Sequence, residues 1–397
     1  MISIRKTTAA TVLSLATFTG VTSYSQNKPP QIPTLIEKKV LPFIQPDKKL
    51  SPALPGESVI TDEVLRKDLT FLARDKNRGR QAGEGILERE VTEYIENIFK
   101  ELDLRKVCDN GKSYRQSMII DWVDKKDPLK DFHNVKAEGQ RQKGLSKADK
   151  DAVLIPAEKK PENLSREAIR THNLVALIEG SDEKLKDTYI VLCAHMDHVG
   201  IDRLAKPGED YIYNGADDNG SGTTVVLSNA RAINQAKKDG FGPKRSIIIL
   251  LATAEEMGLL GSKFFVENPP VPLDRISAMI NLDMVGRMER TCISVLDTDN
   301  TGMPNFFHYE HDAIAKATGI ERIDHNIEFG RRRSDQAHFA DKRIPFLLIF
   351  EGLEPNGMLH KDYHGVSDEV GKIDFAKMLR VSRFTYRHVL RAANWKN

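Results

Sequence analysis

The chain has 397 residues, of which 40% are hydrophobic and 29% charged, a balance typical of a globular protein with a sizeable core and not of a disordered one. Its 59 basic and 57 acidic residues nearly cancel, so the composition predicts neither nucleic acid nor an anionic membrane as a partner. Beyond the first residues, no stretch reaches the roughly 18 apolar residues of a membrane span, and none is expected.

Residues 1–25 are predicted to be a secretory signal peptide. Two basic residues precede an uncharged, moderately apolar run, Thr7–Gly20, and small residues follow up to Ser25. A buried helix is the alternative, but polar, proline-containing sequence comes next. We therefore expect an exported protein, periplasmic or extracellular, in which residues 26–56, rich in proline and lysine, form a linker or extended arm.

Residues 57–397 are predicted to form the main domain. Its first clear element is an amphipathic helix, "LEREVTEYIENIFKELDL", with apolar residues at helical spacing. The strand-like "SMIIDW" follows, and residues 124–170 are then densely charged, with only "AVLIPA" able to bury apolar surface. About 45 residues without periodicity are too few for a convincing domain, so we interpret this segment as a surface insertion.

From Asn173 the sequence changes to four apolar runs of strand length, "NLVALIE", "YIVLCA", "SIIILLATA" and "ISAMINLDM". Helical patterns lie between most of them. This alternation predicts an α/β protein with a mainly parallel sheet that is covered on both faces. Cys193 and Cys292 lie in strand-like runs and the only other cysteine is Cys108, so we expect no disulfide bond.

Histidines and acidic residues follow three of these strands. They are His195, Asp197 and His198 after the first, Glu255 and Glu256 after the second, and Asp283 after the third. Ligands of open α/β sheets usually bind beyond the carboxyl ends of the strands. These side chains are therefore predicted to meet at one edge of the sheet.

Taken singly, each group also has a structural explanation. His195 and Asp197 lie on the same side of an extended chain, so the carboxylate can hold one imidazole nitrogen and leave the other as a ligand. Asp217 and Asp218, in "YNGADDNGSG", could instead cap the helix that follows. Asp283 could equally serve in a cap or salt bridge.

Together, these groups favour a metal centre. "LHKDYHGVSDE" adds His364, with Asp368 four residues on. Two histidines and three or four carboxylates at one sheet edge need a divalent cation, and mixed nitrogen and oxygen ligands suit zinc. Five protein ligands exceed one tetrahedral zinc, which predicts two ions about 3.5 to 4 Å apart with a bridging carboxylate. Neither a GxxxxGK[ST] loop nor a GxSxG nucleophile motif is present.

The ordered motifs "AHMDHVG", "GADDNGSG", "ATAEEMGLLGS", "NLDMVGR", "SDQAHF" and "YHGVSDE" resemble the M28 family of metallo-aminopeptidases, which also has carboxypeptidase-like and cyclase branches. The resemblance runs from about Leu65 to the C-terminus and includes "FLARDKNRGRQAGE". It implies an exported bacterial dizinc enzyme. The implied fold is a three-layer α/β/α zinc-exopeptidase fold with a mixed, mainly parallel central sheet.

The resemblance also implies the metal ligands. His195 and Asp283 would hold one zinc, Glu256 and His364 the other, and Asp218 would bridge the two Zn²⁺ ions.

Four further residues match functional positions of the family. Asp197 and Asp368 would orient the two histidine ligands. Glu255 falls at the general base, and Tyr363 resembles a tyrosine that in some members hydrogen-bonds the developing oxyanion. Packing in the pocket wall is the alternative for Tyr363.

Some positions depart from the family pattern. Gln336 stands where many relatives have histidine, with His338 two positions on, and this affects pocket shape more than chemistry. The run Arg331–Arg333 could anchor a substrate carboxylate or form a solvated loop.

The expected function is that of an exported dizinc metallopeptidase that removes N-terminal residues from peptides, with Glu255 as the base. One alternative is another chemistry of the family, a carboxypeptidase-like hydrolase or a glutaminyl cyclase with a single zinc. The other is a non-catalytic binding ectodomain on the same fold. Because all five ligand positions and the base are intact, the sequence favours the dizinc hydrolase.

Overall fold

The computed structural model describes residues 53–122, 152–159, 164–165, 168–287, 292–298, 302–325, 328–354 and 357–395. All of them belong to one compact unit, Lys48–Asn397. The predicted signal peptide, most of the predicted linker and residues 123–151 of the predicted insertion lie outside the described residues, so those assignments stay predictions. Within the described ranges, no helix has both the length and the apolar character that a membrane crossing requires.

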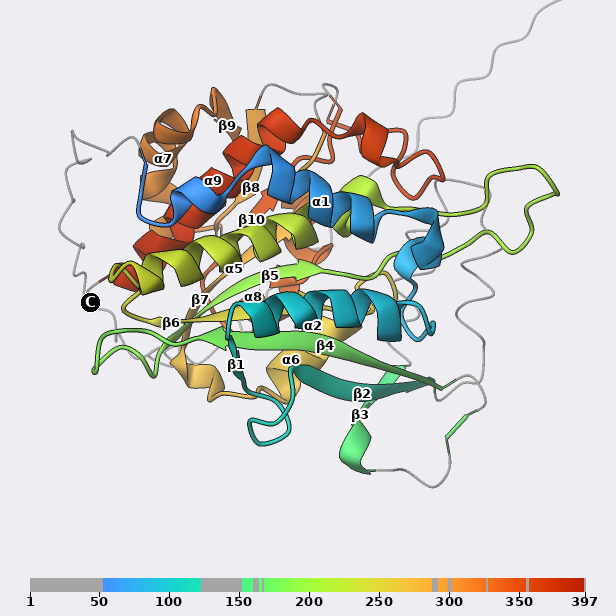
Figure 1. Ribbon diagram of the computed structural model, residues 1–397, viewed down its shortest axis with the longest axis horizontal. Helices are drawn as coiled ribbons and strands as arrows, with labels where there is room; N and C mark the ends of the chain where they lie inside the picture. The colour runs from blue at the N-terminus through green and yellow to red at the C-terminus, as the bar shows by residue number, and fades with distance from the viewer. Residues whose placement is uncertain are drawn as a thin grey trace, which may run out of the picture. The chain divides into compact units, whose positions relative to one another are not determined.

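One mixed sheet organises the described part of the chain (Figure 1). Its strands lie in the order β3-β2-β4-β6-β5-β7-β10-β8-β9, and β1 pairs with β4. Strands β6, β5, β7 and β10 are mutually parallel, whereas β4, β2 and β3 continue the sheet in antiparallel pairings on one side. The strands are β1 (Arg105–Lys106), β2 (Arg115–Trp122), β3 (Ala152–Pro156), β4 (Ile169–Ile178), β5 (Tyr189–His195), β6 (Ser246–Ala252), β7 (Ile276–Asp283), β8 (Cys292–Leu296), β9 (Arg322–Asp324) and β10 (Phe346–Phe350).

The four apolar runs predicted as strands form β4, β5, β6 and β7, which confirms that prediction. Every residue of β6 is buried, because a central strand covered on both faces has no solvent side. Val191 of β5 lies between Ile248 of β6 and Met279 of β7, and this register aligns the carboxyl ends of the three strands. The segment "AVLIPA" supplies β3 at the edge of the sheet.

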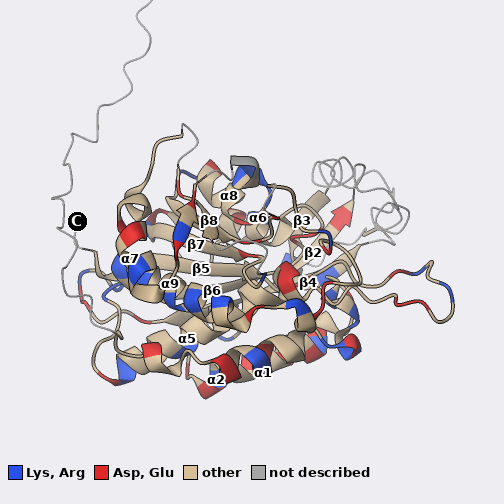
Figure 2. Ribbon diagram, turned by 90° about the horizontal axis from the view of Figure 1, so that it is seen from above, with Lys and Arg blue, Asp and Glu red and all other residues tan. Residues whose placement is uncertain are grey.

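Helices cover both faces of the sheet, as predicted. Helices α1, α2, α5 and α9 pack on one face, and α6 and α8 lie on the other (Figures 1 and 2). The bounds are α1 (Asp62–Leu72), α2 (Thr92–Glu101), α5 (Gly222–Lys238), α6 (Leu260–Glu267), α7 (His311–Thr318), α8 (Gln336–Asp341) and α9 (Phe375–Asn394). The predicted amphipathic helix is α2, extended at its start by a π turn, Leu87–Val91. All three cysteines are buried and free, so the expectation of no disulfide bond is confirmed.

Candidate metal centre

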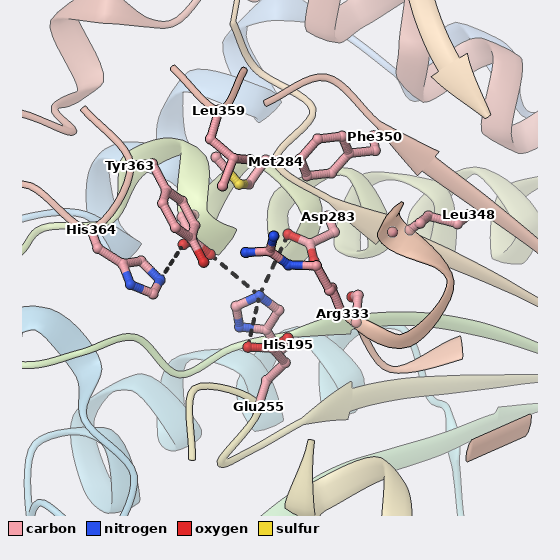
Figure 3. Close-up of a pocket in the computed structure, with 13 residues that line it drawn as sticks. His195, Glu255, Asp283, Met284, Arg333, Leu348, Phe350, Leu359, Tyr363 and His364 are labelled. Carbon is pink, nitrogen blue, oxygen red and sulfur yellow. Dashed lines mark ion pairs between the residues drawn. The ribbon is translucent and has the colours of Figure 1, made fainter. Parts of the chain in front are cut away.

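The candidate site lies where the parallel strands end (Figure 3). His195 is the last residue of β5 and Asp283 the last of β7, while Glu255 and Glu256 follow β6 after a short turn. Asp218 comes from the π turn Ala216–Ser221 that precedes α5. The structure thus brings residues from separate motifs to one edge, the arrangement expected for ligand sites of open α/β sheets.

Three of the predicted ligands form a first group. The Nε2 atom of His195 lies 3.4 Å from Oδ1 of Asp218 and 3.7 Å from Oδ1 of Asp283. Ligand atoms about 2.0 to 2.1 Å from a tetrahedral zinc are separated from one another by about 3.3 Å. All three side chains are buried, so the group fits one zinc ion with little rearrangement.

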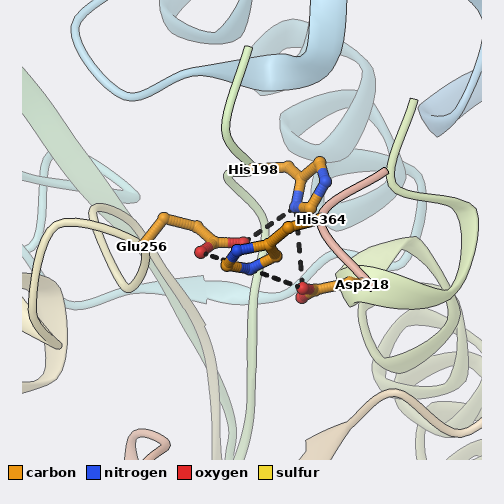
Figure 4. Close-up of side chains that lie close together, drawn as sticks. All are labelled: His198, Asp218, Glu256 and His364. Carbon is orange, nitrogen blue, oxygen red and sulfur yellow. Dashed lines mark hydrogen bonds and ion pairs between the residues drawn. The ribbon is translucent and has the colours of Figure 1, made fainter. Parts of the chain in front are cut away.

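The second group uses the other oxygen of Asp218 (Figure 4). The Nε2 atom of His364 lies 3.1 Å from Oδ2 of Asp218 and 2.9 Å from Oε2 of Glu256. Because Oδ1 of Asp218 faces the first group and Oδ2 faces the second, this carboxylate is positioned as a bridge. The donor set and its geometry therefore fit a two-metal centre.

His198 is a buried member of the second group that was absent from the predicted ligands. Its Nδ1 atom lies 2.8 Å from Oε1 of Glu256 and 3.8 Å from Oδ2 of Asp218. Burial lowers the pKa of His198, which favours the neutral imidazole that can donate to a carboxylate or bind a metal. In the sequence, His198 is the last residue of "AHMDH", directly beyond the predicted strand. The resemblance to the family gave it no role.

Glu255 faces the first group and stays partly open to the pocket. Its Oε2 atom lies 4.0 Å from Nε2 of His195, farther than the carboxylate oxygens of Asp218 and Asp283. Loss of solvent contact, aided by the charges of nearby acids, raises the pKa of Glu255 well above its usual value. A carboxyl group with this placement is suited to proton transfer, and a bound cation would favour its ionised form.

Buried acids near the site hold their protons more tightly than exposed ones do. Burial raises the pKa of Asp197 to about 7 and that of Asp335 to about 6. Although burial alone would lower the pKa of His364, the neighbouring charges of Glu256 and Asp218 raise it to about 9. Divalent cations would replace these protons and satisfy the carboxylates, which is the electrostatic reason for a metal here.

The predicted roles of Asp197 and Asp368 in orienting the two histidines stay predictions, and both carboxylates also hold the main chain near the site. The Nδ1 atom of His195 lies 3.2 Å from the backbone oxygen of Asp197 and 3.8 Å from its carboxylate, so the backbone carbonyl is the nearer acceptor. The Asp197 carboxylate instead accepts from the backbone N–H of Glu255 at 3.2 Å. His195 is thus held by a backbone carbonyl, and Glu255 is held through its backbone N–H.

Asp368, predicted to orient His364, contacts the backbone at Asp217 and Asp218. Its carboxylate accepts hydrogen bonds of 3.0 Å from the backbone N–H groups of Asp217 and Asp218. His360 holds the side chain of Asp217, with its Nε2 atom 3.3 Å from Oδ2. The described contacts of Asp368 therefore set the backbone from which the side chain of Asp218 projects.

Arg80 holds the loops behind the site together. It is 1% exposed and donates to the backbone oxygens of Met196, Asn214 and Gly215 at 3.1, 2.6 and 2.9 Å. Burial lowers its pKa to about 10, partly offset by Asp368 and other acids of the site, so it remains cationic at neutral pH. It lies within "FLARDKNRGRQAGE", a motif to which the sequence assigned no chemical role.

The pocket beside the two groups combines an apolar wall with polar side chains (Figure 3). Its further lining residues are Met284, Gly330, Arg333, Ser334, Leu348, Phe350, Leu359 and Tyr363. The ring of Tyr363 stacks on His364 with centroids 3.9 Å apart. Loss of solvent contact and nearby negative charge raise the pKa of Tyr363 well above its usual value, so its hydroxyl stays a hydrogen-bond donor. Gln336, by contrast, accepts from Asn281 and donates to Gly330 in the buried layer.

Comparisons with known proteins identify the family of the chain. The model of peptidase family M28 matches residues 173–389, more than half of the chain. Leupeptin-inactivating enzyme 1 of Streptomyces exfoliatus is 35% identical over 141 residues, which are 35% of this chain and 30% of that protein. Leucine aminopeptidase 2 of Arthroderma otae is 25% identical over 344 residues, 81% of this chain and 64% of the relative. The chain thus spans less than two thirds of the length of either relative.

A solved structure shares the fold. BSAP, a zinc aminopeptidase from Bacillus subtilis, has a TM-score of 0.59 and 16% sequence identity, covering 85% of this chain and 96% of BSAP. The three-layer fold with a mixed sheet, predicted from the sequence, is therefore confirmed.

Proposed function

Since the chain belongs to peptidase family M28, we propose that it is a zinc-dependent aminopeptidase that hydrolyses the first peptide bond of peptide substrates. The observation that carries the proposal is the position of Asp218, whose two carboxylate oxygens face two separate groups of ligands. We further propose that two zinc ions bind per chain. His195 and Asp283 would hold one ion, and Glu256 and His364 the other.

The residues of the chain divide the chemistry between them. Bound zinc would polarise the substrate carbonyl and lower the pKa of a bound water toward about 7. Glu255, which is not needed as a ligand, takes the proton of the attacking water and delivers it to the leaving amine. The Tyr363 hydroxyl donates a hydrogen bond to the carbonyl oxygen as negative charge develops on that oxygen. This hydrogen bond stabilises the transition state by about 3 kcal/mol.

The pocket also indicates the substrate. Met284, Leu348 and Phe350 provide an apolar wall beside the ligand groups, which suits an apolar side chain on the residue that is released. The carboxylates around the site suit the positively charged amino group of a free N-terminus. Export to the periplasm or the cell exterior, suggested by the first 25 residues, is part of the proposal.

Arg333 supports a second candidate function. Its side chain lines the same pocket and points toward the ligand groups in Figure 3. A guanidinium there could bind the terminal carboxylate of a peptide, as a carboxypeptidase-like hydrolase requires. The sequence run Arg331–Arg333 thus contributes at least one arginine to the pocket.

Three substrates separate these functions. The full chain, loaded with zinc, is given leucine p-nitroanilide, its N-acetylated form, and an N-acetylated dipeptide with a free carboxyl end. We expect cleavage of the first only, its loss on chelation, and its return with zinc. Cleavage of both anilides at similar rates would refute the aminopeptidase proposal, and cleavage of the blocked dipeptide alone would establish the second candidate. The Glu255→Gln protein, purified identically, controls for contaminating peptidases.

A further inference from the structure

A second group of histidines surrounds Asp297, and none of its members is among the residues that line the pocket. Asp297 directly follows β8 and His325 directly follows β9. Because β8 and β9 are parallel neighbours, paired up to Ser294 and Asp324, both side chains emerge at the same edge of the sheet. His308 lies in the 3-10 turn Phe306–Glu310 and His311 begins α7.

Three of these side chains are close enough to share an ion, and His308 adjoins them. Oδ2 of Asp297 lies 2.9 Å from Nε2 of His311 and 3.1 Å from Nδ1 of His308. Ligand atoms of Asp297, His311 and His325 all lie within 4.8 Å of one another. The rings of His308 and His325 have their centroids 5.0 Å apart. Three candidate ligands thus converge, and His308 lies beside Asp297 as a fourth.

The hydrogen bonds of His388 decide which nitrogen of His311 carries a proton. Nδ1 of His388 lies 3.0 Å from the backbone oxygen of Phe384. A carbonyl oxygen only accepts, so this nitrogen is protonated. In a neutral ring of the fully buried His388, Nε2 is then an acceptor. Nδ1 of His311, 2.9 Å away, must then be the donor.

This assignment leaves the other nitrogen of a neutral His311 with a lone pair that faces a carboxylate oxygen at 2.9 Å. Two acceptors at this distance repel unless a cation lies between them. A metal ion uses all four side chains. The hydrogen bond between His311 and His388 would also fix the orientation of the His311 ring, as contacts outside the ligand shell do in metal sites.

Burial and access fit such an ion. Asp297 and His311 are almost fully buried, whereas His308 is 37% exposed and His325 is exposed, so an ion can enter from the solvent side. Three imidazoles and one carboxylate complete a tetrahedral shell with no open position, which is typical of structural and not catalytic zinc.

We propose that Asp297, His308, His311 and His325 bind a structural zinc ion that joins the ends of β8 and β9 to the start of α7. On binding, the contacts of Asp297 with His308 and His311 would widen by a few tenths of an ångström toward about 3.3 Å, the spacing of zinc ligands. The site is independent of the proposed peptidase function, since it uses none of the residues assigned to that function.

Metal counting on the full chain tests this proposal. The wild type, the His308→Ala/His325→Ala variant and the Asp218→Ala/His364→Ala variant are stripped with chelator, reloaded with zinc, desalted and analysed by mass spectrometry with protein quantification. We expect the double histidine variant to hold one zinc fewer per chain than the wild type and to keep its peptidase activity. The Asp218→Ala/His364→Ala variant should retain one zinc per chain.

Controls separate ligand loss from damage to the fold. Tyr309→Ala, at a neighbouring side chain that is 74% exposed, should leave the zinc content unchanged. The single variant His325→Ala changes only an exposed side chain and should bind this zinc more than about 100-fold more weakly, beyond the effect of losing an outer contact. Equal zinc content in the wild type and the double histidine variant, or no zinc left in the Asp218→Ala/His364→Ala variant, would overturn the proposal. Because the readout is metal content, a failure of the peptidase proposal would not produce either result.

Discussion

The adjacent residues Glu255 and Glu256 should respond differently to the same substitution. Replacing either by glutamine keeps the shape of the side chain and removes its charge. Loss of solvent contact raises the pKa of Glu255 well above its usual value, so in the metal-free protein the charged form of its carboxyl is disfavoured. Burial alone would do the same to Glu256, but His364 and His198 lower its pKa to about 2, so it is ionised.

The expected magnitudes follow from these contacts. Glu255→Gln should change the free energy of unfolding of the metal-free protein by less than about 1 kcal/mol, because it removes a charge that burial already disfavours. Glu256→Gln removes a buried anion that contacts His364 at 2.9 Å and His198 at 2.8 Å, and should cost about 3 to 5 kcal/mol. In catalysis, loss of a general base lowers kcat about 10²- to 10⁴-fold, equivalent to about 3 to 5.5 kcal/mol in the barrier.

Three measurements on the two variants distinguish the roles. Urea unfolding of the stripped proteins gives the stability change, mass spectrometry gives zinc content, and leucine p-nitroanilide hydrolysis gives kcat. Glu255→Gln should keep its zinc and lose turnover, whereas Glu256→Gln should lose zinc together with turnover. A Glu255→Gln protein with near-wild-type kcat, or a Glu256→Gln protein with full zinc content, would refute these assignments.

Other residues give three further predictions. Arg80→Met should destabilise the protein by about 3 to 5 kcal/mol in urea unfolding, because buried backbone carbonyls lose their donor and a buried cation is removed. As a control, substitution of the exposed Arg66 in Arg66→Met should cost less than about 0.5 kcal/mol. Equal effects of the two substitutions would contradict the role of Arg80. Asp362 accepts from Arg287 at 2.8 Å and from Ser367 and Lys372 at 2.5 Å, and although burial raises its pKa, these contacts lower it well below the usual value. The stabilisation by ionised Asp362 is therefore present above the unfolded pKa of about 3.9 and is lost as pH falls through the folded pKa. Asp362→Asn should cost about 3 to 5 kcal/mol at pH 7. The difference in unfolding free energy between this variant and the wild type should become smaller below about pH 4. Arg333→Gln should change KM for peptides with a free carboxyl end near the cleaved bond while leaving kcat for leucine p-nitroanilide within about threefold, and unchanged KM for every peptide would exclude a substrate contact.

The pattern of apolar residues was sufficient to predict the strands and the positions of the polar residues at their ends. Strands β5, β6 and β7 are buried on both faces, so they require unbroken apolar runs such as "SIIILLATA", and such runs are visible in the sequence. The polar residues at the ends of these strands, including His195 and Asp283, are visible in the sequence because each one interrupts an apolar run. The helix from Leu87 followed from its apolar spacing, which reflects one buried face.

The relations between these elements depended on the tertiary structure. Sheet order brings Asp218 between two ligand groups, and the separate directions of its oxygens arise from the turn before α5 and from Asp368, 150 residues away in sequence. Arg80 contacts backbone oxygens 116 and 134 residues away, and main-chain acceptors leave no signature in side-chain patterns.

The histidines show the same division. His198 belongs to a recognised motif, yet its contact with Glu256 depends on how two strand ends lie against each other. Asp297, His308, His311 and His325 carry no recognisable spacing, because their ligand geometry is created by the pairing of β8 with β9 and by the packing of α7 on α9. The sequence by itself determined which residues could do chemistry at the strand ends, while long-range packing decided which of them meet and with what orientation.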